Sequence, residues 1–374
     1  MLLRQTNSDF DVFIIGAGPA GTAAAISLRE IIPDIRVCIA DGGKTAAFRI
    51  GESVPPPIKP FLDQLGVTSA FAQAEHSPSF RTLNAWGSAR LESNEFLLHV
   101  HQTGWRLNRA HFDAMLKTEA MRRGAIFVPA RVTSLTGNAH DWRIECSNAE
   151  KFSARYIVDA SGGAAIAARK LKFTPRKLDR LIACAVFFAG QARQSSTIDA
   201  NAPLIEACQH GWWYTAAIPD NKRVVMLMTD TDIARRLGIA RMPTWLRHLS
   251  LTDHIQACTG MASPLTQPLV FPASSRYFAD TYPFGIVPAG DAVSRFDPLS
   301  SQGIVKALRS ALYASYAIAD HHLKGDTMGF SKYFTLMRDE FEHYATTWQT
   351  YYRQEQRWPD APFWQRRHGM KPSQ

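Results

Sequence analysis

The sequence has few cysteines, and none of them are paired in sequence. Its five cysteines lie far apart and form no CxxC pair: Cys38, Cys146, Cys184, Cys208 and Cys258. This spacing argues against a zinc site and against a disulfide framework. It fits a reducing compartment, and the sequence predicts a cytoplasmic protein.

Long apolar runs and long basic runs are also missing. No apolar stretch approaches the length of a membrane span, and the first ten residues, MLLRQTNSDF, contain no signal-peptide core, so we expect no membrane attachment. The formal net charge is +9, but Lys and Arg are scattered. This distribution indicates a solvated basic surface and no nucleic-acid partner.

The remaining composition is that of an ordinary globular protein. The chain has 374 residues, of which 46% are hydrophobic and 20% are charged. This length has room for two or three structural units around a large core.

The most informative stretch is DVFIIGAGPAG at residues 11–21. An apolar run from Val12 to Ile15 predicts a buried parallel strand, and Gly16, Gly18 and Gly21 follow at GxGxxG spacing. In such a turn the first glycine permits the tight bend, the second lets the backbone approach a pyrophosphate, and the third lets the helix pack on the strand. Ala20 keeps that helix slim. The pattern predicts a phosphate on a helix N-terminus.

Other segments extend this dinucleotide site. A second strand-like run ends at Asp41, twenty positions after Gly21, where an acidic residue accepts hydrogen bonds from ribose hydroxyls. Asn108 predicts a helix N-cap, and Arg109 lies in the first turn, where the helix dipole disfavours a cation. We therefore expect Arg109 to contact the phosphate. The run YIVDA (156–160) contains Asp159 and leads into a second glycine turn containing Gly162.

The loop after Asp41 is rich in glycine and proline, which suits a rigid segment beside a ligand. Its polar residues are Arg49, Glu52, Ser53 and Lys59, and each is as readily solvated as functional. From this loop and its neighbours, four further residues are predicted to bind the cofactor: Gly42, Arg49, Ser53 and Val132.

Strands are also predicted between residues 80 and 104, most clearly in EFLLHVHQ (95–102). His99 and His101 share one face there, but no third ligand is indicated, so no metal site is predicted.

The region from Leu171 to about Ser275 is rich in predicted strands, with a helical insert at roughly 232–250. An antiparallel sheet inserted into the dinucleotide domain would form one wall of a substrate cavity. Trp212, Trp213 and Tyr214 either line that cavity or belong to the core. The tail after residue 333 is aromatic and basic, and it predicts a helix ended by Pro359. The sequence leaves open whether this tail folds back or meets a partner.

Taken together, these blocks resemble the FAD-dependent oxidoreductases that include p-hydroxybenzoate-hydroxylase-type monooxygenases, tryptophan halogenases and geranylgeranyl reductases. The resemblance implies non-covalent FAD and an α/β fold, in which a Rossmann-like three-layer FAD domain carries an inserted antiparallel sheet and C-terminal helices. It also implies that Gly290 and Asp291 reach the ribityl and phosphate groups. The residues implied beside the flavin ring are Pro298, Ser301, Gln302, Gly303 and Ile304.

The domain boundaries expected from this resemblance follow the predicted elements. The FAD domain is expected at 1–75, 104–170 and 276–322, the substrate domain at 76–103 and 171–275, and a helical tail at 323–374.

Three strings, IGESVPP, GWWYTAAIPDNKRVVMLMTDTD and YYRQEQRWPDAPFW, are most similar to the halogenase-like flavoproteins that mature quinone-cofactor oxidases. The subgroup implies an oxygenase that uses O2 to modify a tryptophan in the precursor of a cysteine-tryptophylquinone oxidase. The implied reductant is a nicotinamide or a separate flavin reductase.

Within this interpretation, Pro298 and residues 301–303 shape the reaction pocket, residues 212–214 wall it, and Glu52 or Lys59 handles protons. Halogenases carry a WxWxIP motif and a catalytic lysine after the GE pair. Here WWYTAAIP departs from that motif and Lys59 is one position off, which argues against halogenation, although a one-residue loop shift would restore Lys59. The alternatives are a small-molecule aromatic hydroxylase or halogenase, and a flavin-binding assembly factor without chemistry.

Overall fold

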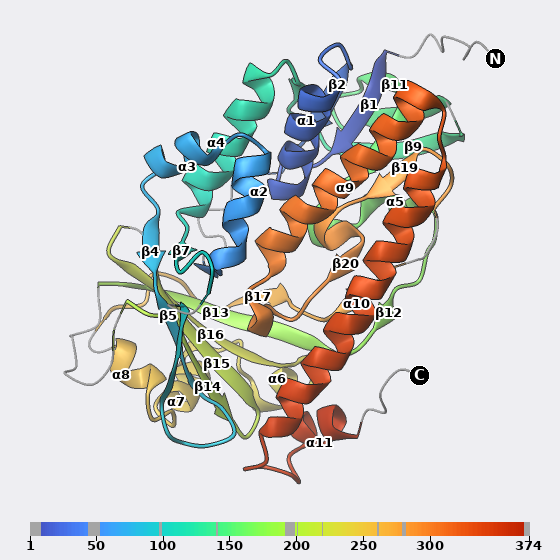
Figure 1. Ribbon diagram of the computed structural model, residues 1–374. Coiled ribbons are helices and arrows are strands. Elements are labelled where there is room, and N and C mark those ends of the chain that lie inside the picture. Colours follow the sequence, from blue (N-terminus) through green and yellow to red (C-terminus); the bar gives the residue numbers. More distant parts are fainter. Residues whose placement is uncertain are drawn as a thin grey trace.

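The computed structural model describes residues 9–43, 53–96, 99–139, 141–190, 199, 201–218, 220–259, 262–278 and 282–369. Two large sheets lie at opposite ends of the molecule, and a long C-terminal helix runs past both (Figure 1).

The first sheet has seven strands in the order β8-β2-β1-β11-β10-β9, with β19 paired to β11. Its strands are β1 (Phe10–Ile15), β2 (Val37–Ala40), β8 (Ile126–Val128), β9 (Val132–Asn138), β10 (Asp141–Cys146), β11 (Lys151–Asp159) and β19 (Ile286–Pro288). Strands β8, β2, β1, β11 and β19 are mutually parallel. Their carboxyl ends therefore meet at one edge, where ligands bind in open α/β sheets.

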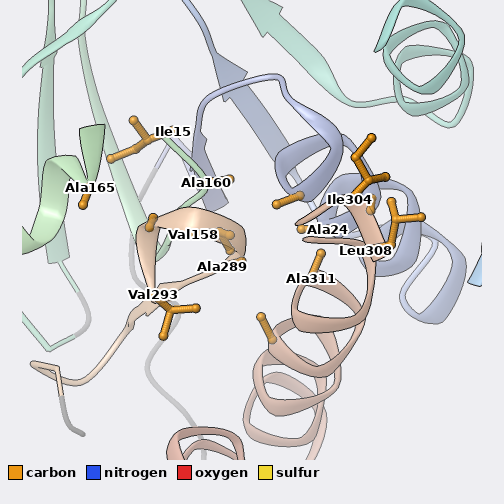
Figure 2. Close-up of a cluster of buried hydrophobic side chains, with 14 of the residues drawn as sticks. Ile15, Ala24, Val158, Ala160, Ala165, Ala289, Val293, Ile304, Leu308 and Ala311 are labelled. Carbon is orange, nitrogen blue, oxygen red and sulfur yellow. The ribbon is translucent and has the colours of Figure 1, made fainter. Parts of the chain in front are cut away.

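Helices cover this sheet. They are α1 (Pro19–Ile31), α2 (Lys59–Gln64), α3 (Thr68–Gln73), α4 (Arg109–Arg122), α5 (Ile166–Lys170) and α9 (Gly303–Lys324). Helix α1 packs against both α4 and α9. Its alanines, including Ala24, let these helices approach closely, and Figure 2 shows Ala24 beside Ile304, Leu308 and Ala311 of α9.

The second sheet also has seven strands, in the order β17-β13-β16-β15-β14-β5-β6. They are β5 (Arg81–Ala85), β6 (Glu92–Glu95), β13 (Leu181–Ala189), β14 (Leu204–Cys208), β15 (Gly211–Ile218), β16 (Lys222–Asp230) and β17 (Leu269–Pro272). Every pair is antiparallel except β14 with β5. Helices α6 (Thr231–Leu237), α7 (Met242–Leu249) and α8 (Ile255–Thr259) follow β16 in the chain. The strands predicted within residues 171–275 and the helical insert are confirmed.

Within the described ranges, two small three-stranded sheets and four short 3-10 turns join these parts. The sheets are β3 (Ser53–Val54), β7 (Gly104–Arg106) and β4 (Ser77–Ser79), and β12 (Arg176–Lys177), β18 (Arg276–Tyr277) and β20 (Ser294–Arg295). The turns are η1 (Pro56–Ile58), η3 (Gly162–Ala164), η4 (Gly290–Ala292) and η5 (Pro298–Ser300).

The strand predicted over residues 95–102 is wrong. Strand β6 ends at Glu95, and residues 99–101 form a turn, with Gln102 at a positive φ of 51°. Alternation of apolar residues suggested a strand, but His99 and Val100 are exposed and have no sheet to bury them. Within the described ranges, no group of three His, Cys, Asp or Glu side chains could hold a metal ion.

The tail forms α10 (Met328–Gln354) and α11 (Pro362–His368). The helix predicted to end at Pro359 already ends at Gln354. The tail folds back over the body: Trp86 donates to the carbonyl of Tyr351 over 2.8 Å, and Arg367 donates to Asp230 over 2.9 Å. Among the described helices, none has both the length and the apolar composition needed to cross a bilayer.

The predicted domain boundaries stay a prediction, because strand pairing shows only which segments share a sheet.

Candidate functional site

The glycine-rich turn after β1 is packed so tightly that two of its glycines admit no side chain. Gly16 has a φ of +103°, and a Cβ there would lie 2.5 Å from the carbonyl oxygen of Ala160. A Cβ on Gly21 would lie 1.9 Å from the carbonyl oxygen of Gly16. These contacts fix the strand, the turn and α1 in one arrangement. Ala20 is buried in the first turn of α1, as the requirement for a slim helix predicts.

Gly18 differs from its two neighbours. It is the N-cap residue of α1, and no atom lies within 4 Å of the position that a Cβ would occupy. The first N–H groups of a helix have no intrahelical partner. The space beside Gly18 therefore opens onto free donors at the positive end of a helix dipole, as a pyrophosphate requires.

Asp41 follows β2 and holds the same turn from the other side. Its Oδ2 accepts a hydrogen bond from the backbone N–H of Ala17 over 3.0 Å, and its Oδ1 accepts one from Gly43 over 2.7 Å. The carbonyl of Gly42 accepts a hydrogen bond from Arg131 over 3.1 Å, and Val132 starts β9 next to it. Asp41 therefore lies at the carboxyl edge of the sheet, beside the glycine turn.

The turn after β11 is organised by Asp159. This fully buried carboxylate accepts hydrogen bonds from the backbone of Ser161 over 3.0 Å and of Ala167 over 2.7 Å. Burial raises the pKa of its carboxyl group above the usual range, and the hydrogen bonds oppose that shift. Both oxygens are used by the chain, so Asp159 shapes the turn. Gly162 has a φ of +61° and open space where a Cβ would lie.

The turn after β19 contains Gly290 and Asp291. The backbone N–H of Gly290 donates to Ser310 of α9 over 2.8 Å. Asp291 lies 3.0 Å from the ammonium group of Lys306 and 3.6 Å from Arg295. The side chain of Lys306 is fully buried, and burial lowers its pKa. Asp291 therefore compensates a buried cation and still presents 38% of its side chain to solvent.

Arg109 is the first residue of α4. The N-cap of this helix is Asn108, whose side-chain oxygen accepts a hydrogen bond from the backbone N–H of His111 over 3.2 Å. The guanidinium of Arg109 lies 3.3 Å from the carboxylate of Asp113 on the next turn. Sequence reasoning attributed a cation in this position to a phosphate. The structure supplies an intrahelical carboxylate partner, and a phosphate contact stays a prediction.

The loop before α9 runs from η5 to the first residue of that helix. Ser301 has a left-handed φ of +50°, and Gly303 is the first residue of α9, with open space where a Cβ would lie. Pro298 starts η5, Gln302 is exposed, and Ile304 is buried.

Asp297 anchors this loop. Its Oδ1 accepts from the N–H of Leu299 over 2.9 Å, and its Oδ2 accepts from Trp348 over 3.0 Å and Tyr352 over 2.7 Å. The carboxylate is fully buried, which raises its pKa. Asp297 therefore connects the loop to α10.

A cavity of about 780 Å³ opens beside this loop. Its described walls are the 297–302 loop, one face of α10, the β5–β6 hairpin, Arg309 and Tyr313 of α9, and residues around β3, β4 and β7. Its ionisable lining groups are Glu92, Asp297, Arg309, Glu340 and His343. Arg309 and Glu340 form an ion pair.

The predicted wall of residues 212–214 does not form as one surface. Trp212 and Tyr214 point to one side of β15 and Trp213 to the other, because side chains alternate along a strand. Trp213 packs on Trp245 with ring centroids 5.1 Å apart, and Trp212 donates to Tyr352 over 2.8 Å. Both tryptophans belong to the core, which is one of the two roles that the sequence left open. The hydroxyl oxygen of Tyr214 lies 2.9 Å from that of Ser53, and Ser53 lines the cavity.

Of the two predicted proton-handling residues, the structure describes Lys59. Lys59 is exposed at the start of α2 and is absent from the described lining. Glu52 and the predicted cofactor ligand Arg49 lie outside the described residues.

Sequence reasoning missed Asp297, Lys306, Glu340 and His343. Asp297 directly precedes Pro298, so its position next to the predicted flavin-binding residues could have identified it. Glu340 and His343 lie three residues apart on the polar face of a long helix, a pattern that normally indicates solvent exposure.

A Cβ at Gly18, Gly162 or Gly303 would have no neighbour within 4 Å, so these positions leave room for a bound dinucleotide. Comparison with known proteins agrees. The family described as tryptophan halogenase matches residues 11–83 and 77–374. LodB of Marinomonas mediterranea, named as an FAD-dependent oxidoreductase, is 30% identical over 370 residues, covering 96% of this chain and 97% of LodB.

Solved structures show the same fold. The flavin-dependent halogenase CmlS superposes with a TM-score of 0.86 at 22% identity, covering 98% of this chain and 68% of CmlS. The peptidyl tryptophan dihydroxylase QhpG, described as essential for tryptophylquinone cofactor biogenesis, superposes with a TM-score of 0.76 at 22% identity, covering 98% of this chain and 80% of QhpG. The family match and the similarity to LodB extend over nearly the whole chain, so this protein belongs to the tryptophan halogenase family and is an FAD-dependent oxidoreductase.

Proposed function

We propose that this enzyme oxygenates a tryptophan side chain within a partner protein, the precursor of a cysteine-tryptophylquinone oxidase. The observation that carries the proposal is the cavity of about 780 Å³ beside the loop that leads into α9. It extends along α10 well beyond the space that a single aromatic ring fills. Similarity to the fold of a peptidyl tryptophan dihydroxylase supports a protein substrate, and similarity to LodB supports flavin-dependent oxidation. The three strings named above resemble those of a glycine oxidase maturation flavoprotein, so a glycine oxidase precursor is the first substrate to test.

In this proposal FAD lies along the carboxyl edge of the first sheet. Gly16, Gly18 and Gly21 hold the pyrophosphate at the N-terminus of α1. Asp41 accepts a hydrogen bond from a ribose hydroxyl, in addition to the one that it accepts from the backbone N–H of Ala17. Asp291 and Gly290 face the ribityl chain. Residues 298–304 border the flavin ring, where the N-terminus of α9 stabilises negative charge.

When bound and reduced, FAD supplies the electrons with which O2 is divided into an oxygen atom for the substrate and a water molecule. The chain positions the aromatic ring and excludes water from it. Glu340 and His343 line the described cavity and replace Lys59 as the groups within reach of a substrate proton. A nicotinamide or a separate flavin reductase supplies the electrons that reduce FAD.

Oxygenation is favoured over halogenation by the position of Lys59. A catalytic lysine must reach the substrate cavity, but Lys59 is exposed, and the described cavity lining contains no lysine. A small-molecule aromatic halogenase remains the second candidate, because the matched family is described as tryptophan halogenase.

The test is intact-mass measurement of the precursor, expressed with and without this protein. We expect added oxygen on the precursor tryptophan, dependent on flavin reduction and O2. An unmodified precursor together with efficient oxidation or halogenation of free tryptophan would overturn the proposal. FAD binding without O2-dependent turnover in either mixture would favour an assembly factor.

A further inference from the structure

The cavity follows one face of α10 over most of its length. Five of the helix residues that line it are spaced three or four apart, and so share a face: Glu340, His343, Thr347, Tyr351 and Gln354. The lining begins one turn earlier, at Leu336. At 1.5 Å per residue, the stretch from Leu336 to Gln354 is about 27 Å long. The cavity is therefore an elongated groove.

The β5–β6 hairpin forms the opposite wall. Thr82 pairs with Asn94 and Asn84 pairs with Glu92 across this antiparallel hairpin, so these four side chains share one face. All four line the cavity. Strand β6 is the last strand of its sheet. The groove thus lies between a helix face and a hairpin face, each a regular element.

Amide side chains in this groove have unused hydrogen-bonding capacity. Asn84, Asn94 and Gln354 line it from both walls, and their side chains make no hydrogen bond to any residue that the structure describes. An amide side chain offers donors and an acceptor that match a peptide group. Apolar contact is available at both ends of the α10 face, where Leu336 is 43% and Tyr351 is 53% exposed.

Charge in the described lining is sparse. Glu340 is paired with Arg309, and Asp297 is buried with all its hydrogen bonds made inside the protein. This leaves one exposed carboxylate in the described lining, Glu92, and the exposed ring of His343. An occupant that carried several charges would find few partners, whereas a chain of neutral peptide groups would find the amides.

We propose that the groove between α10 and the β5–β6 hairpin binds an extended, uncharged segment of the partner polypeptide on either side of the tryptophan to be modified. This inference rests on the proposed function and adds how the substrate is held. At about 3.3 Å per residue, the groove accommodates about eight residues of extended chain. Recognition acts mainly through peptide groups, so a generic sequence around the tryptophan is an adequate probe.

The test uses the FAD-loaded enzyme and dye-labelled Gly-Ser peptides with one central tryptophan, in lengths from about three to about eleven residues, followed by fluorescence anisotropy. We expect the affinity to rise with length up to about eight residues and then to level off. Thr347→Trp should fill the middle of the groove and weaken binding of the longer peptides about tenfold. Thr346→Trp is the matched control, because Thr346 is the adjacent exposed threonine and does not line the cavity.

Length-independent affinity, or equal effects of the two substitutions, would overturn the inference, as would tight binding of free tryptophan with no gain from added residues. The two proposals fail separately. If the precursor stays unmodified while affinity still rises with length and falls in the Thr347 variant, the groove stands and the proposed chemistry is wrong. If the precursor is oxygenated but neither effect appears, the chemistry stands and the groove is wrong.

Discussion

The carboxyl edge of the first sheet is formed mainly by backbone atoms, whereas the groove along α10 is formed by side chains. At the sheet edge, backbone meets backbone, and a Cβ on Gly16 or Gly21 would lie 2.5 Å or less from a carbonyl oxygen. The groove is lined by side chains of α10 and by side chains of the β5–β6 hairpin, two elements that are far apart in sequence. The first surface depends on local chain geometry. The second depends on how the tail folds back.

The largest effect is expected from substitutions within the glycine turn. Gly21→Ala places a Cβ 1.9 Å from a backbone oxygen that cannot move without displacing β1, so the free energy of unfolding should fall by about 4 kcal/mol. Gly18→Val meets open space in the protein and should leave the fold intact, but it obstructs the pyrophosphate, so FAD should be lost. Denaturant unfolding and the flavin content of purified protein measure these two outcomes. A yellow Gly18→Val variant with full flavin content would show that the cofactor site is wrongly placed.

Asp291 joins the sheet edge to the interior, and its loss should have the next largest effect. Asp291→Ala leaves the buried ammonium group of Lys306 without its carboxylate, which should cost about 3 kcal/mol of stability and should also weaken FAD retention. The double variant Asp291→Ala with Lys306→Met removes the unpaired charge. It should regain stability without regaining FAD affinity, as measured by fluorescence quenching. If both properties return together, Asp291 acts on the flavin only through the fold.

The sequence reveals the sheet edge because its requirements are local. Glycines at fixed spacing, apolar runs before them and Asp41 after the second strand are required by the turn itself, and the structure places these elements next to one another. The strands within residues 171–275 were predictable for the same reason, because apolar runs and turn residues bound them.

The groove could not be predicted, because its residues are distant in sequence and ordinary in type. Glu340, His343 and Thr347 resemble the solvated face of any long helix. Trp212 and Trp213 suggested a pocket wall because of their size, although strand alternation places them on opposite faces of β15. Lys306 resembles a surface lysine until the helix that carries it is seen packed against η4.

Asp297 connects the two surfaces, and its isosteric replacement distinguishes them. Asp297→Asn replaces one carboxylate oxygen by an amide NH2, which must face either the N–H of Leu299 or the donors of Trp348 and Tyr352, so at least one buried bond is lost and stability should fall by about 2 kcal/mol. FAD should still bind, because the pyrophosphate turn is elsewhere, with a small loss of affinity because Asp297 anchors the loop proposed to border the flavin ring. Peptide affinity should fall more, as α10 loosens. Asp339→Asn, at an exposed position of α10, is the control and should change neither property. Loss of FAD with unchanged peptide affinity would reverse the roles of the two surfaces.

The smallest effect is expected from His76, which lies where the small sheet of β3, β7 and β4 joins α4. Its Nδ1 accepts a hydrogen bond from the backbone N–H of Asn108 over 3.3 Å, and its ring packs against Phe71 and Phe112.

Burial, together with the charge of His111, lowers the pKa of His76 to about 4. The unfolded chain has a histidine pKa near 6.5, so it binds more protons than the native state between about pH 6.5 and pH 4. The stability contributed by the neutral ring is therefore complete above pH 6.5 and is lost as the pH falls toward 4, with a loss of about 2 kcal/mol between pH 7 and pH 5. His76→Asn keeps an acceptor near the Nδ1 position but does not titrate, so it should be less stable than the wild type at pH 7 and show a flatter decline toward pH 5 in thermal unfolding. An equally steep decline in the variant would assign the acid sensitivity of this junction to other groups.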